Sequence, residues 1–305
     1  MFSNLRSLIF KLDPETAHSL AIKSLKFNFA GNILDDDKNN PLFKTKLFKQ
    51  ELENPIGIAA GFDKNAEVYN SLFKLGFGFV EVGTVTPLKQ YGNPKPRVFR
   101  LVEDEALINR LGFNNSGAKN VLDRIKSKKQ LGLLGVNIGP NKETKDRNND
   151  YIECFKTFHG VADYITINIS SPNTEDLRSF HNELKLDELL KIVNKEKKIL
   201  NSKIPIVVKV SPDISDQDIS KVSDVLLDNS IEAVIISNTS DSTRDGLNNI
   251  LKHQKGGLSG KPIEEKSTRL ISKFYNILKG RIKIIGVGGV DSGESAYKKF
   301  LSGAD

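Results

Sequence analysis

The chain of 305 residues is poor in the side chains that build metal sites and covalent cross-links. It has one cysteine, Cys154, and four scattered histidines. A single cysteine excludes an intramolecular disulfide and a cysteine-cluster metal site, and it fits a reducing compartment. The histidines lack the spacing of a metal-binding motif such as H-E-x-x-H. We therefore expect no metal centre.

Long apolar runs are scarce as well. No stretch approaches the ~20 apolar residues of a membrane-spanning helix, and the N-terminus lacks the apolar core and cleavage site of a signal peptide. The formal net charge of +7 would suit nucleic acid, anionic lipid or small acidic ligands. Because the lysines are spread out and no basic run is interleaved with aromatics, nucleic-acid binding is not expected. The protein is expected to be cytosolic, or to lie on a membrane without crossing it.

The first 31 residues differ from the rest of the chain and predict two short helices, over 2–12 and 14–31. Asp13 is a suitable N-cap for the second helix, and Pro14 suits its first position. Apolar residues recur at helical spacing in both segments. Two uses of this pattern remain open: a helical hairpin packed on the main domain, or an amphipathic pair lying on a bilayer.

A polar stretch over 35–41 predicts a linker, so we divide the chain into an N-terminal helical segment, 1–40, and a main domain, 41–305. The main domain begins with an alternating pattern over 42–55 that predicts a short hairpin. Apolar runs then recur seven times, at 56–61, 79–84, 133–139, 164–170, 204–212, 233–239 and 282–289. Helical patterns separate most of them, at 65–75, 183–200, 215–229, 263–279 and 291–302.

Apolar runs that alternate with helices predict βαβ units and a parallel sheet. Seven such units favour an α/β fold of the TIM (β/α)8-barrel type over a doubly wound sheet. An eighth strand should follow the helix that ends near Leu301, and we expect this chain to lack that last β/α unit. Two stretches, 84–114 and 239–262, interrupt the alternation directly after strands, where barrel active sites are built.

Each of the seven apolar runs ends in residues that can bind a ligand. They are Lys64, Thr84, Asn137, Asn168 with Ser171 and Asn173, Lys209, Ser237 with Asn238 and Thr239, and Gly288 with Gly289. One such residue could simply cap a strand or a turn. Seven at one face of a barrel indicate a polar, planar ligand, because buried amides and ammonium groups need partners.

Two glycine-rich stretches indicate that this ligand also carries a phosphate. "GVGG", after the last strand and before a helix, suits a phosphate, and "GGLSGKP" at 256–262 is either a mobile loop or a second phosphate contact. The chain has no P-loop pattern and no strand-coupled G-x-G-x-x-G. A barrel site of this kind indicates a phosphorylated cofactor such as FMN.

These motifs resemble those of the dihydroorotate dehydrogenase family, specifically its class 2, membrane-associated, quinone-linked branch. The matching stretches run in the family's order from 54 to 290: "NPIGIAAGFDKN", "EVGTVTP", "NPKPRVFRL", "INRLGFNN", "GVNIG", "NISSPNT", "VVKVSPD", "SNT", "GGLSGKP" and "IIGVGGV". The N-terminal helical pair is also a feature of class 2. The resemblance implies a barrel that binds FMN and oxidises (S)-dihydroorotate to orotate in pyrimidine (UMP) biosynthesis.

The resemblance also implies partners and a location. The electron acceptor would be a quinone, ubiquinone or menaquinone. The protein would lie peripherally on the cytoplasmic side of a membrane, the inner membrane in a bacterium, through its N-terminal helices.

Site residues follow from the same motifs. Ser171 falls on the family's catalytic base, where class 1 relatives carry cysteine; Cys154 lies elsewhere, on a predicted helix, and is taken as structural, as is Ser170. Implied FMN contacts are Ala60, Gly61, Lys64, Thr84, Asn137, Asn168, Lys209, Ser237, Gly260 and Gly289. Implied substrate contacts are Lys64, Asn109, Arg110, Leu111, Gly112, Phe113, Asn168, Asn173, Asn238 and Thr239.

The chain departs from the family pattern in two places. Ser237 stands where relatives often have threonine, which keeps a hydroxyl. The family's eighth strand, whose segment completes the FMN phosphate site, has no counterpart here, so we expect that half of the site to be missing. Two other functions remain open: a soluble, class 1-like dehydrogenase using fumarate or NAD, and a non-catalytic flavin- or pyrimidine-binding barrel.

Overall fold

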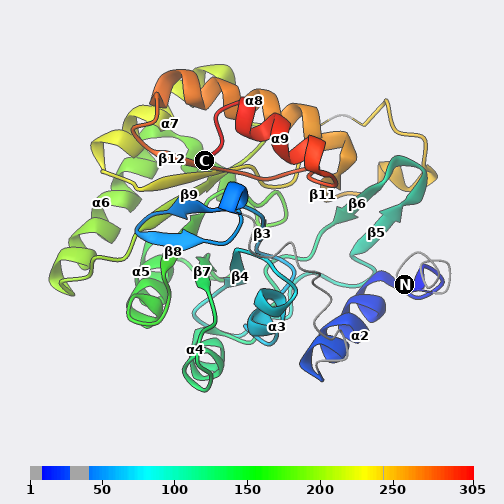
Figure 1. The fold of residues 1–305 in the computed structure, drawn as a ribbon, viewed down its shortest axis with the longest axis horizontal. Coiled ribbons are helices and arrows are strands. Elements are labelled where there is room, and N and C mark those ends of the chain that lie inside the picture. The colour runs from blue at the N-terminus through cyan, green and yellow to red at the C-terminus, as the bar shows by residue number, and fades with distance from the viewer. Residues whose placement is uncertain (1–8, 28–40, 243) are drawn as a thin grey trace.

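The computed structural model describes residues 9–27, 41–242 and 244–305. Its centre is a curled parallel sheet of seven strands (Figure 1). In order across the sheet these are β12 (Lys283–Gly286), β10 (Ala233–Ile236), β9 (Ile206–Val210), β8 (Tyr164–Asn168), β7 (Leu133–Ile138), β4 (Phe79–Val85) and β3 (Gly57–Ile58). All seven predicted strands are present. Within the described residues β3 and β12 are the sheet's two edges, so the barrel-type fold is confirmed as seven strands of an open barrel.

Helices surround the sheet (Figure 1). They are α3 (Tyr69–Lys74), α4 (Ala118–Lys126), α5 (Arg147–Phe158), α6 (Glu183–Ile199), α7 (Asp216–Asp228), α8 (Glu264–Leu278) and α9 (Gly293–Leu301). Side-chain caps start several of them: Asn182 accepts from the Leu184 N–H, and Ser215 from the Asp218 N–H. Short 3-10 helices lie in the loops: η2 (Pro41–Phe43), η3 (Val102–Asp104), η4 (Leu177–His181), η5 (Ile250–His253) and η6 (Lys261–Ile263).

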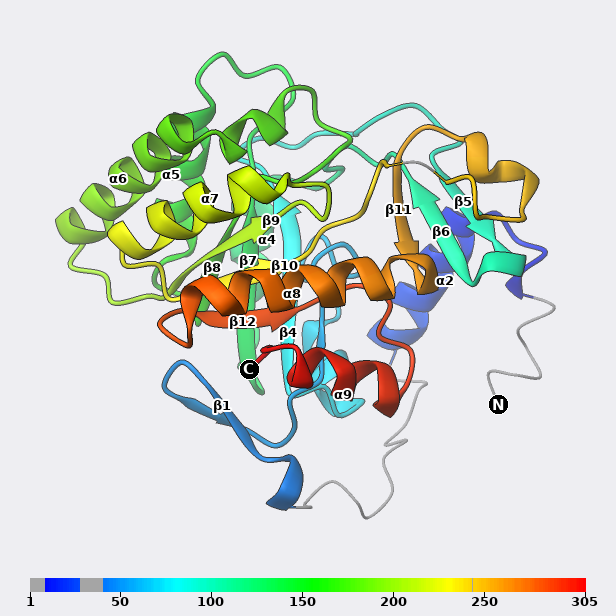
Figure 2. The same ribbon diagram turned by 90° about the horizontal axis from the view of Figure 1, so that it is seen from above.

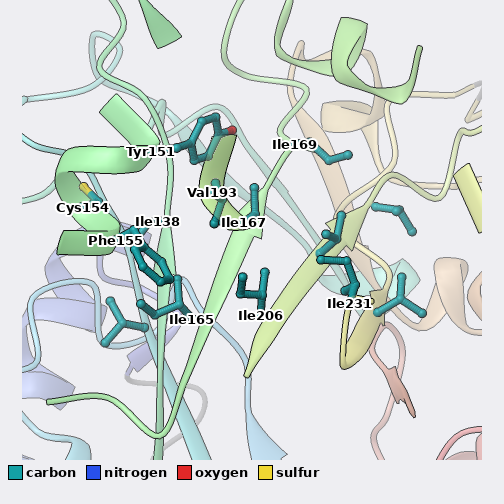
Figure 3. Packing of buried hydrophobic residues seen from close by; sticks show 14 of the residues in the cluster. Ile138, Tyr151, Cys154, Phe155, Ile165, Ile167, Ile169, Val193, Ile206 and Ile231 are labelled. Carbon is teal, nitrogen blue, oxygen red and sulfur yellow. The ribbon is translucent and has the colours of Figure 1, made fainter. Parts of the chain in front are cut away.

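The main core fills the layer between the sheet and these helices. Every residue of β7, β8 and β9 is buried, as expected of parallel strands covered on both faces. Figure 3 shows this packing around Ile138, Ile165 and Phe155, with Cys154 of α5 beside them. Cys154 is fully buried, which fits the structural role predicted for it.

The side chains on the inner face of the curled sheet change from apolar to polar along the strands. At their amino ends Leu133, Tyr164 and Val207 form an apolar cluster. Leu47 and Leu52 complete that cluster from the predicted hairpin, which is β1 (Thr45–Leu47) paired antiparallel with β2 (Gln50–Leu52). Side chains alternate along a strand, so positions two and four residues further on share this interior face. Several of those positions are polar, which leaves hydrogen-bonding groups towards the carboxyl ends.

The two stretches that interrupt the βα alternation form a second sheet, which was not predicted. It contains β5 (Val98–Leu101), β6 (Ala106–Asn109) and β11 (Gly257–Gly260), antiparallel and in the order β11-β6-β5. Its apolar residues, including Phe99, Ile108 and Leu258, make a cluster of their own. Figure 2 shows this sheet beside the barrel, next to helix α2 (Pro14–Lys26).

Helix α2 is the second predicted N-terminal helix, with Asp13 accepting from the Thr16 N–H at 3.0 Å as its N-cap. It is fastened to the main domain: Glu15 accepts two hydrogen bonds from Arg97, at 2.9 and 3.0 Å, and Ser71 Oγ donates to the Leu25 carbonyl. The first predicted helix, apart from 9–12, and the linker, apart from Pro41, lie outside the described residues. Among the described helices, none is long and apolar enough to cross a membrane.

Candidate functional site

A cavity of about 1310 Å³ runs from the hairpin and α2 to the carboxyl ends of the strands and the second sheet. It collects nearly all of the predicted site residues from loops far apart in sequence. Those that line it are Ala60, Gly61, Lys64, Thr84, Asn109, Leu111, Gly112, Phe113, Asn168, Ser171, Asn173, Lys209, Ser237, Asn238, Thr239, Gly260 and Gly289. Asn137 and Arg110 are not part of its wall.

Asn137 lies behind the wall, in a chain of hydrogen bonds across three strands. Its Oδ1 accepts from Thr84 Oγ1 at 2.6 Å and from Asn168 Nδ2 at 3.2 Å. Asn168 Nδ2 also donates to Thr84 Oγ1 at 3.0 Å. Because these groups satisfy one another, Asn137 holds the two lining side chains in fixed orientations and does not itself face the cavity.

Glu81, which the sequence analysis did not single out, anchors this chain. Glu81 is 2% exposed, and its carboxylate accepts from Asn137 Nδ2 at 2.9 Å and from Thr166 Oγ1 at 2.7 Å. Glu81 was counted as part of an apolar run, yet a carboxylate in the middle of a buried strand was itself a signal.

Lys209 projects into the cavity from β9 and is buried. Burial lowers the pKa of its ammonium, and the negative charge of Glu81 opposes that shift. No hydrogen bond or ion pair to Lys209 Nζ occurs within the described part of the chain. A buried cation without a protein partner calls for an electron-rich ligand group, because an unpaired buried charge is costly.

The two adjacent serines after β8 face different surroundings. Ser170 is fully buried; its Oγ donates to Asn168 Oδ1 at 2.8 Å and accepts from Asn238 Nδ2 at 2.9 Å. Ser171 lines the cavity, where its Oγ accepts from the Asn173 N–H at 3.2 Å. The geometry therefore gives Ser170 a supporting position and leaves the Ser171 hydroxyl available to a ligand.

The predicted substrate loop, 109–113, joins the second sheet to the Ser171 segment. Asn173 Nδ2 donates to the Asn109 carbonyl at 3.0 Å. Arg110 points the other way: it donates to Gln254 Oε1 and the Pro96 carbonyl, both at 2.9 Å, and stacks over Phe99. Arg110 thus holds the loop in place instead of reaching the cavity.

Lys64 lies on the wall next to this loop. Its Nζ donates to Asn114 Oδ1 at 2.7 Å, one residue beyond the predicted substrate loop. Burial lowers the pKa of Lys64 to about 8; the charge of Arg97 adds to this shift, and that of Glu15 opposes it. Lys64 is therefore a cation that loses its charge at mildly alkaline pH.

The glycines after β12 form one end of the cavity. Gly288 and Gly289 have φ of +117° and +69°. A Cβ on Gly289 would lie 2.5 Å from the Cβ of Glu264, the first residue of α8. No acceptor for the amide N–H of either glycine occurs among the described residues, so both donors are open to a ligand.

Two further observations fit a phosphorylated flavin. Gly61 has a φ of +112°, and a Cβ there would meet nothing within 4 Å, so the wall leaves room for a flat ring. Lys299, another residue not predicted, lies buried on α9 with its Nζ 2.6 Å from Ser267 Oγ, which donates to the Gly288 carbonyl. The open amides and the nearby cation fit a phosphate at this end.

These features define an α/β-barrel protein with a cavity lined by polar and cationic side chains at the carboxyl ends of its strands. The family model described as dihydroorotate dehydrogenase matches residues 42–305. The chain therefore belongs to the dihydroorotate dehydrogenase family, and membership implies a flavin cofactor.

Individual relatives agree with this assignment. A protein of Bartonella tribocorum named dihydroorotate dehydrogenase (quinone) is 47% identical, over 98% of this chain and 84% of its own length. One of Agrobacterium fabrum with the same name is 44% identical, over 100% of this chain and 85% of its own. Among solved structures, DHODH from Eimeria tenella in complex with ferulenol superposes with a TM-score of 0.91 at 36% identity, covering 96% of this chain and 84% of that one.

Proposed function

We propose that this protein oxidises (S)-dihydroorotate to orotate with FMN as cofactor and passes the electrons to a quinone, as a step of pyrimidine biosynthesis. The similar proteins named dihydroorotate dehydrogenase (quinone) support the reaction and the acceptor. The observation that carries the proposal is Ser171, a hydroxyl on the cavity wall beside Asn173, with the buried Lys209 on the same wall.

In this proposal, residues at different places on the cavity wall have different roles in the reaction. When bound, the flavin would supply the acceptor for the hydride, a hydrogen with two electrons, that leaves C6 of the substrate. Ser171 removes the proton from C5 of dihydroorotate. Serine is a weak base, so its own proton must leave to solvent or a neighbour as charge develops. Asn173 donates its backbone N–H to Ser171 Oγ, which orients the hydroxyl.

Other wall residues bind and orient. The amides of Asn173 and Asn238 hold the pyrimidine ring, which turns proton removal into a step between pre-positioned groups. Lys64 attracts the substrate's carboxylate. Lys209 provides positive charge towards the flavin ring, and the open amides of Gly288 and Gly289 bind its phosphate.

The visible spectrum tests this proposal. The purified protein, loaded with FMN, should be yellow and should bleach when dihydroorotate is added without oxygen. Adding a quinone should then restore the colour. A protein that binds flavin but does not bleach would support a non-catalytic barrel, and recovery with fumarate or NAD in place of quinone would support a class 1-like enzyme.

Substrate binding should depend on pH through Lys64. Its ammonium is charged below a pKa of about 8 and neutral above it. The attraction for a carboxylate is therefore present at neutral pH and is lost as the pH rises. Above the pKa the charged fraction of Lys64 falls on the order of tenfold per pH unit, and the affinity for orotate should fall with it. Titration of the flavin spectrum with orotate between neutral and alkaline pH measures the effect. A Lys64→Gln variant should bind orotate weakly with a flat profile; an equally steep profile in that variant would assign the titration to another group.

We propose that the N-terminal helices bind a membrane surface and admit the quinone. Helix α2 supports this because Leu20 is 49% exposed and Phe27, the residue directly after the helix, is 72% exposed, although the helix is fastened to the barrel by Glu15 and Leu25. A helix that packs on the barrel on one side and exposes apolar residues to solvent is suited to the bilayer interface. The protein would then be peripheral, on the cytoplasmic side.

Leu20→Glu tests the membrane proposal. A charge at this position should weaken sedimentation with lipid vesicles and slow reduction of a membrane-dissolved quinone, while flavin reduction by dihydroorotate stays unchanged. Leu184→Glu is the matched control, because Leu184 is 77% exposed at the start of α6. Equal vesicle binding by both variants and the parent protein would show that α2 is not the membrane contact.

A further inference from the structure

Arg178 connects loops that carry the proposed catalytic groups, yet it is not part of the cavity wall. It lies on η4, seven residues after Ser171 along the chain. Its Nε donates to the Ser170 carbonyl at 3.2 Å, and its Nη2 donates to the Thr239 carbonyl at 3.1 Å. One guanidinium therefore joins the loop after β8 to the loop after β10.

The remaining guanidinium nitrogen of Arg178 binds carboxylates. Its Nη1 pairs with Asp213 Oδ2 at 3.2 Å and also with Asp241. Asp213 follows β9, so a third loop enters the same cluster. The planar fork of arginine suits this task, because it directs several donors at fixed angles from one rigid group.

Asp213 is itself well held. Its carboxylate accepts from Ser240 Oγ at 2.6 Å, from the Asp241 N–H at 2.9 Å, and from Lys266 of α8. Burial acts to raise the pKa of Asp213, but the hydrogen bonds from Lys266 and Ser240 outweigh it and keep the pKa below its usual value. Asp213 is thus a stable anion that holds Nη1 of Arg178, while Nε and Nη2 donate to the two carbonyls.

The contacts of Arg178 fall next to groups that meet the substrate in the proposed function. Ser170 precedes the proposed base, Ser171, and Thr239 follows Asn238. A second hydrogen bond joins the same two loops, from Asn238 Nδ2 to Ser170 Oγ at 2.9 Å. Loss of Arg178 would therefore leave the loops joined but would release the backbone that sets the spacing between the base and the amides.

We propose that Arg178, fixed by Asp213, is a positioning residue for proton abstraction: it sets the distance between Ser171 and the substrate-binding segment at 238–239. The inference rests on the proposed function. Arg178 acts on the backbone of both segments and touches no reacting atom. A shift of about 1 Å in such a site can cost on the order of 100-fold in rate.

Arg178→Lys in the FMN-loaded protein tests the inference. Lysine keeps the charge, but its donors lie on a single nitrogen and cannot reproduce the planar arrangement of Nε, Nη1 and Nη2. We expect normal flavin content and melting temperature, normal reoxidation by quinone, and reduction by dihydroorotate slowed by about 10- to 100-fold. The isotope effect with dihydroorotate deuterated at C5 should increase, because removal of that proton becomes slower than the other steps. A mere loss of folded protein would lower the amplitude of bleaching without changing the isotope effect.

Asp213→Asn should reproduce the effect of Arg178→Lys, and the double variant should be no slower than either single variant, because the two residues act as one unit. Arg147→Lys is the matched control. Arg147 Nη2 donates to the Glu175 carbonyl at 2.7 Å, on the loop that follows Ser171, without reaching the loop after β10.

Three results would overturn the inference: an unchanged rate and isotope effect in Arg178→Lys, an equal loss in Arg147→Lys, or a loss explained by a lower melting temperature alone. Failure of the proposed function would look different, because the unaltered protein itself would not bleach with dihydroorotate.

Discussion

Ser171→Ala is expected to slow reduction of the bound flavin by dihydroorotate by about 10²- to 10⁴-fold, the range for loss of a general base. Ser171 is the hydroxyl of its segment that lines the cavity, and within the described residues its Oγ has one hydrogen bond, which it accepts from the Asn173 N–H. Removing it takes away the proton acceptor but leaves the walls that bind flavin and substrate. Rapid-mixing absorbance measures the rate, and flavin content and orotate titration should remain near normal.

Ser179→Ala is the control for this variant. Ser179 belongs to η4, in the same segment, and its Oγ accepts from Lys185 Nζ, away from the cavity. It should reduce its flavin at the normal rate. If Ser171→Ala also does so, another group removes the proton and the assignment of the base is wrong.

Lys209→Met should slow flavin reduction by about 10²- to 10³-fold, the usual cost of losing one preorganised electrostatic contact. It should also make the midpoint potential of the bound flavin more negative. Lys209 is a buried cation on the cavity wall, and its positive charge favours a ligand that gains electrons. Methionine preserves the length and apolar stem of the side chain but removes that charge.

Potentiometric titration of the flavin measures this effect, with Lys195→Met on the exposed face of α6 as the control for loss of one lysine. A normal potential and rate in Lys209→Met would show that this ammonium does not act on the flavin. A lower flavin content with a normal potential would assign Lys209 to binding alone.

The barrel strands could be predicted from the sequence because parallel strands covered on both faces form uninterrupted apolar runs, as in β8 and β9. The same periodicity located the second N-terminal helix and its Asp13 cap. Motif order located the cavity wall, so most predicted site residues lie together. Asn137 and Arg110 are the exceptions, since position in a motif does not show which way a side chain points.

The second sheet could not be predicted in the same way. Strands β6 and β11 pair Ile108 with Leu258, and β11 contains two glycines in four residues, so neither periodicity nor propensity marks it as a strand. Glu81 and Lys299 were also missed. A carboxylate inside a buried strand marked Glu81 as unusual, whereas Lys299 lies in an ordinary helical pattern. For both residues the partners are known from the folded chain.

The stretch 165–178 shows which properties the local sequence determines and which depend on the tertiary structure. Its residues alone identify a buried strand that ends in a polar turn, because alternation and the asparagines are local properties. The roles of Ser170, Ser171 and Arg178 are not local. Ser170 is hydrogen-bonded to Asn238, and Ser171 lines the cavity. Arg178 donates to the Thr239 carbonyl and pairs with Asp213. These partners come from loops distant in sequence. Those contacts exist because the curled sheet brings the carboxyl ends of its strands to one face, where side chains from separate βα units meet.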